Sequence, residues 1–160
     1  VEDRKLEMLQ RVVDIELTDT LREELGQTYS PQVEAEQSRY YPGWGTFEIE
    51  ASIDTAQVDA TRKAMIETIA KLRAAPVDAD VLLRARQPLL EAYDNALKTN
   101  EGWLNLADDA QSQPDLIGRF VAAKAKLAAI TPAELQAVAA RYLKVSQRLE
   151  IDVLPKAPSS

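Results

Sequence analysis

The chain has 160 residues, enough for one compact domain with its own core and too few for two full domains. Its net charge of −7 argues against a nucleic-acid partner, because proteins that bind nucleic acids carry a clustered basic face. No apolar run approaches the roughly 20 residues that a membrane span requires. We therefore expect a folded globular domain with no nucleic-acid partner and no membrane span.

The sequence contains no histidine and no cysteine. Histidine is the commonest metal ligand and general base, and cysteine is the strongest common nucleophile. We therefore expect no catalytic residue, no metal ligand and no cofactor in this chain. A binding or scaffold domain fits this composition better than an enzyme does.

The first predicted element is an amphipathic helix. Apolar residues recur every three or four positions from Leu6 to Leu25, which is the stripe of a helix with one buried face. Gly26 follows the stripe and suits the left-handed conformation that ends many helices. The chain opens at Val1 directly inside this helical pattern, so we expect that it is a fragment of a longer protein.

Two strands follow this helix. Residues 28–38 have an extended pattern, and a stretch rich in turn formers at 40–45 joins them to a second strand over 47–53. A short turn between neighbouring strands predicts an antiparallel hairpin.

The second strand alternates apolar and acidic side chains, so we expect one of its faces to be buried and the other to be exposed to solvent. We expect Phe47, Ile49 and Ile53 to face the helices. Glu48 and Glu50 should face away, because a slip of one residue would bury every acid in the strand.

Capping residues mark where the next helices begin. Asp54 and Gln57 have the spacing of a capping box before a helix over residues 58–72. Asp78 is placed to cap a longer helix, which must bend or restart near Pro88 because proline removes an interior hydrogen bond.

The last third of the chain is predicted to hold a helical turn at 103–107, a helix over 116–127 and a final helix. The final helix starts at 131–134, where a capping box is combined with a proline at the first helical position. Residues 149–153 alternate apolar and acidic side chains, which predicts a closing strand.

The order of these elements predicts an α+β fold. We expect a two-layer sandwich with a mainly antiparallel sheet and helices packed on one face. Three strands make a thin sheet for so many helices, so we expect at least one more strand before Val1. Residues 1–156 should form the domain and 157–160 a short tail.

One segment carries a family resemblance. Residues 21–31, LREELGQTYSP, resemble the helix-to-strand junction in the second half of zinc peptidases of the pitrilysin/insulysin family. Three further segments are similar to the family in the same order: 76–78, 130–135 and 153–156. Residues 100–104, NEGWL, look like the branch of periplasmic bacterial zinc proteases.

This resemblance implies that the two halves of the intact protein have different roles. The amino-terminal half of such peptidases carries an inverted zinc motif, His-x-x-Glu-His, and the carboxy-terminal half lacks zinc and closes over the substrate. It implies that this chain is the substrate-clamping, non-catalytic domain of a periplasmic zinc metallopeptidase. Zinc is then expected in the missing half, and the partners are that catalytic half, on the same chain or a partner subunit, and a peptide substrate. The alternative is a non-catalytic assembly subunit on the same scaffold.

The resemblance also implies two substrate-binding residues, Arg22 and Tyr29, whose guanidinium and phenol can hold a peptide carbonyl or a developing oxyanion. Each residue also has a purely structural interpretation. Arg22 lies in the last helical turn, where the helix dipole favours a cation. Tyr29 shares strand parity with Val33, so it could be a core tyrosine, although Pro31 between them leaves its facing open.

Overall fold

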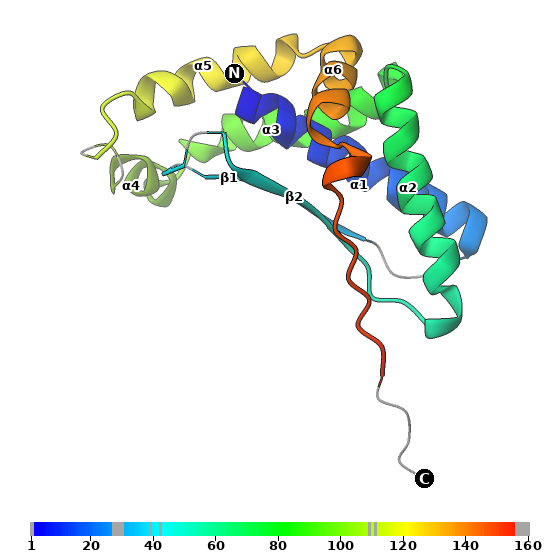
Figure 1. Ribbon diagram of the computed structural model, residues 1–160. Helices are drawn as coiled ribbons and strands as arrows, with labels where there is room; N and C mark the ends of the chain where they lie inside the picture. Colours follow the sequence, from blue (N-terminus) through cyan, green and yellow to red (C-terminus); the bar gives the residue numbers. More distant parts are fainter. Residues whose placement is uncertain are drawn as a thin grey trace.

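The structure is a computed structural model that describes residues 2–26, 31–38, 40–41, 43–108, 110 and 112–155. Most of these residues are helical (Figure 1). The elements in chain order are α1 (Glu2–Leu25), β1 (Gln32–Gln37), β2 (Gly45–Glu50), the 3₁₀ turn η1 (Thr55–Gln57), α2 (Val58–Ala74), α3 (Ala79–Ala96), α4 (Asn100–Asp108), α5 (Leu116–Ala129), α6 (Pro132–Tyr142) and the 3₁₀ turn η2 (Val145–Gln147).

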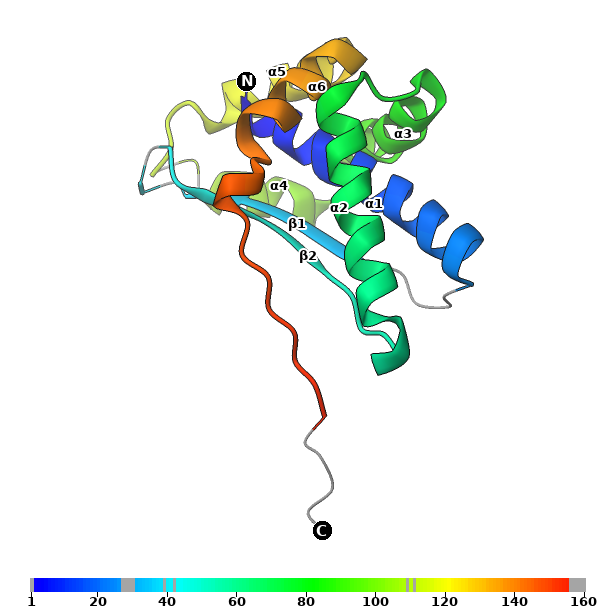
Figure 2. The ribbon, with the colours of Figure 1, turned by 45° about the vertical axis from the view of Figure 1, so that its right-hand side comes forward.

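Helix α1 lies at the centre of the core. It contacts α2, α3, α5, α6 and β1, so it is covered on several sides. The predicted apolar stripe is buried from Leu6 to Leu21, and Met8 and Val12 are buried beside it. This second row was not predicted, because a surface helix needs only one buried face whereas α1 has neighbours around a wider arc. Figure 2 shows α1 running behind α2.

The two strands form an antiparallel hairpin, as predicted. The register pairs Val33 with Ile49 and Glu34 with Glu48. Val33 is buried, and Phe47 and Ile49 pack against the core. Glu48 and Glu50 are exposed and lie on the opposite face, so the predicted orientation is confirmed for β2. Ile53, which was also expected to face the helices, lies beyond the end of β2 and is half-buried.

The predicted helix starts are mostly confirmed. The carboxylate of Asp78 accepts from the backbone N–H of Asp80 (2.7 Å), and Thr131 begins α6 with a complete capping box. Asp54 caps η1, where it accepts from the N–H of Ala56 (2.9 Å), and α2 itself begins at Val58. The prediction for Pro88 was a bend or a restart. The helix does not restart there, because α3 is one continuous helix that contains the proline, and the bend stays a prediction.

The α+β class is confirmed, but the predicted closing strand is wrong. Residues 148–155 are extended, yet within the described chain they pair with no strand. Side-chain alternation predicts an extended backbone, but a strand also needs a neighbouring edge to pair with. Here Glu150 and Asp152 are instead held by Arg62 of α2. One two-stranded sheet does not by itself establish the sandwich that the sequence predicted.

Candidate functional site

The end of α1 positions the first predicted site residue, Arg22. Leu21 is fully buried and fixes the last turn of the helix against the core, which leaves Arg22 exposed beside it. Gly26 follows with φ of +60°, the left-handed conformation that a glycine adopts without steric cost. The cation therefore lies at the carboxyl end of the helix dipole, on the surface.

The chain re-enters the core at β1. Pro31 is buried just before the strand, and the side-chain amide of Gln10 donates to the carbonyl of Val33 (2.7 Å), which ties β1 to α1. The second predicted site residue, Tyr29, lies outside the described residues. Both ends of the junction are thus anchored, while the position of Tyr29 relative to Arg22 stays a prediction.

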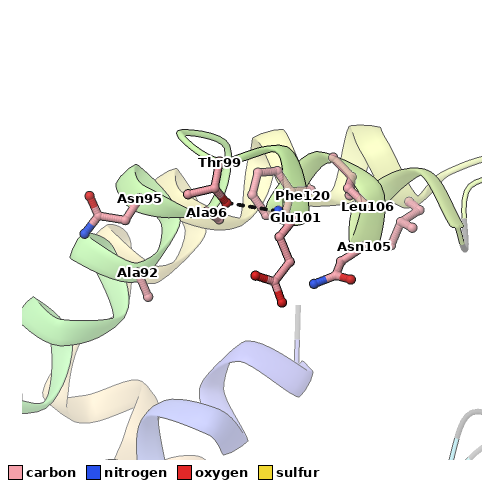
Figure 3. Close-up of a pocket in the computed structure, with 10 residues that line it drawn as sticks. Ala92, Asn95, Ala96, Thr99, Glu101, Asn105, Leu106 and Phe120 are labelled. Carbon is pink, nitrogen blue, oxygen red and sulfur yellow. Dashed lines mark hydrogen bonds between the residues drawn. The ribbon is translucent and has the colours of Figure 1, made fainter.

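A surface hollow of about 550 Å³ lies between α3, α4 and α5 (Figure 3). Its lining combines apolar side chains with a few polar groups. The lining residues are Ala92, Asn95, Ala96, Thr99, Glu101, Gly102, Asn105, Leu106, Leu116 and Phe120. Figure 3 shows Glu101 and Asn105 extending from α4 to the same side. A single carboxylate with amides and a hydroxyl can form hydrogen bonds, but it provides no nucleophile paired with a base.

The corner between α3 and α4 is closely packed. Thr99 accepts from the backbone N–H of Gly102 (3.1 Å), and the indole N–H of Trp103 donates to the carbonyl of Leu97 (2.9 Å). A Cβ on Gly102 would lie 1.5 Å from the carbonyl oxygen of Ala96, so only glycine fits there. The shape of the hollow therefore depends on this glycine, a role that the turn-forming sequence around it did not reveal.

The outer face of the hairpin is acidic. Glu34, Glu36, Glu48 and Glu50 are all exposed there, and Glu34 lies directly opposite Glu48 across the two strands. Like charges in such a pair repel each other. This face therefore has a negative potential that favours a cationic neighbour over an anionic one.

Arg62 is an interaction centre that the sequence analysis missed. Its guanidinium contacts Asp59 (2.6 Å), Glu150 (3.4 Å) and Asp152. The spacing of Asp59 and Arg62 on one helix could have been found from the sequence. The two other acids lie about 90 positions away, and no local pattern connects them to α2.

The residues of this chain do not fit a zinc site. Zinc sites in proteins are built from cysteine and histidine with some carboxylates, and the sequence contains neither of the first two. Within the part of the chain that the structure describes, no three acidic side chains come together as a possible metal site. In the same residues, no helix is both long and apolar enough to cross a membrane.

A comparison with known families decides the assignment. Residues 2–89, more than half of the chain, match the family described as the peptidase M16 inactive domain. The chain belongs to this family. The resemblance to the carboxy-terminal domain of pitrilysin-like peptidases is thereby confirmed. No curated protein matches the chain.

The M16 match covers one part of the structure and omits another. It runs from α1 through the hairpin and α2 to Leu89 in α3, so it includes Arg22 and the sequence position of Tyr29. The residues that line the hollow and the segment after η2 all lie beyond it. The family assignment therefore supports the α1–β1 junction as the candidate functional site more directly than it supports the hollow.

Proposed function

We propose that this M16 domain is the substrate-clamping, non-catalytic part of a zinc metallopeptidase that degrades or processes peptides. The observation that carries the proposal is the match to a domain described as inactive in a family of peptidases. The absence of histidine and cysteine agrees with it, because the zinc then belongs to another half of the protein. That half, on the same chain or in a partner subunit, is the proposed partner.

In this proposal Arg22 and Tyr29 contact the bound peptide. Arg22 is exposed at the end of α1, where a guanidinium can reach a ligand carbonyl without leaving a buried charge unpaired. Tyr29 follows in the short connection to β1, whose two ends are anchored by Leu21 and Pro31. A phenol held there would donate to a peptide carbonyl or to the oxyanion that develops from it.

The test uses the intact protein, including its catalytic half, and measures the turnover of a peptide. We expect Tyr29→Phe to lower kcat about 10²-fold, the usual cost of removing one oxyanion donor, without changing the thermal midpoint. Arg22→Ala should lower turnover as well. Tyr41→Phe and Arg119→Ala are the controls, because both residues are exposed and lie elsewhere on the domain.

Full peptidase activity in both variants would show that the junction is a packing feature and would contradict the clamp. An intact protein without any peptidase activity would favour the alternative, a non-catalytic assembly subunit on the same scaffold. The periplasmic location that we propose rests on residues 100–104, and fractionation of cells that make the intact protein would test it.

A further inference from the structure

We draw no further inference here: the strongest candidate, the surface hollow between α3, α4 and α5, has only exposed side chains as its polar lining, and nothing in the structure shows what fills it.

Discussion

At the scale of single residues, the close approach of two backbones allows only glycine at one position of the domain. Gly102 lies in the first turn of α4, against the end of α3, and the carbonyl of Ala96 occupies the space that a Cβ would take. Gly118, in α5, has open space around the same position and provides a matched comparison. The two glycines look alike in the sequence, because both lie in helical stretches.

We predict opposite effects of alanine at these two positions. Gly102→Ala forces α4 away from α3 and should lower the free energy of unfolding by roughly 1–3 kcal/mol, as overpacked sites do. Gly118→Ala should raise it by roughly 0.5–1 kcal/mol, because alanine loses less conformational entropy in a helix. Urea unfolding of both variants checks this. A Gly102→Ala variant with the same free energy of unfolding as the parent would contradict the close packing between α3 and α4.

At the scale of elements, the start of α6 is fixed by charge as well as by capping. Glu134 accepts from the backbone N–H of Thr131 (2.9 Å), and its other oxygen lies 2.8 Å from the ammonium of Lys5 in α1. The ammonium of Lys5, together with the hydrogen bonds from Thr131, lowers the pKa of Glu134 from 4.5 to about 2. The same carboxylate therefore caps one helix and connects it to another.

This lowered pKa predicts how the start of α6 responds to acid. Because the folded pKa lies below the unfolded one, the stabilisation is fully present above pH 4.5 and is lost as the pH falls toward about 2. NMR titration of Glu134 measures its pKa in the folded protein, and amide exchange at residues 132–135 measures the stability of the start of α6. In Glu134→Gln this part of the pH dependence should vanish. A Glu134 that titrates near pH 4.5 would contradict the contact with Lys5.

At the scale of the whole molecule, Arg62 connects the beginning of α2 to the C-terminal segment, residues 148–155. It gathers Asp59, Glu150 and Asp152, so three carboxylates share one guanidinium. All four groups are close to solvent, where ion pairs are weakened by salt. The contact therefore positions the segment more than it stabilises the fold.

We predict that Arg62→Gln frees the C-terminal segment while the helical core stays folded. The heteronuclear NOE of residues 149–153 should fall to the values of a flexible chain. Salt near 1 M, where screening acts over about 3 Å, should have the same effect on the parent chain. Arg119→Gln is the control, because Arg119 pairs with Asp115, the residue just before its own helix α5. An unchanged NOE in Arg62→Gln would show that other contacts hold the segment.

The sequence by itself determined the local features of this domain. The leucine stripe placed α1, Gly26 ended it, Thr131 and Glu134 began α6, and alternation oriented β2. The segment around Arg22 and Tyr29 also pointed to the M16 family, which the match over residues 2–89 confirms. Each of these features depends on residues within a few positions of one another, so periodicity and capping chemistry are sufficient to predict them.

Only the tertiary structure decided the features that join distant parts of the chain. Alternation at residues 149–153 predicted a paired strand, but pairing depends on a neighbouring edge, and the structure holds that segment by Arg62 instead. The second buried row of α1 and the need for glycine at position 102 likewise follow from which elements pack against each other. Local sequence sets the conformation of a segment, whereas its neighbours in space decide what that conformation contacts.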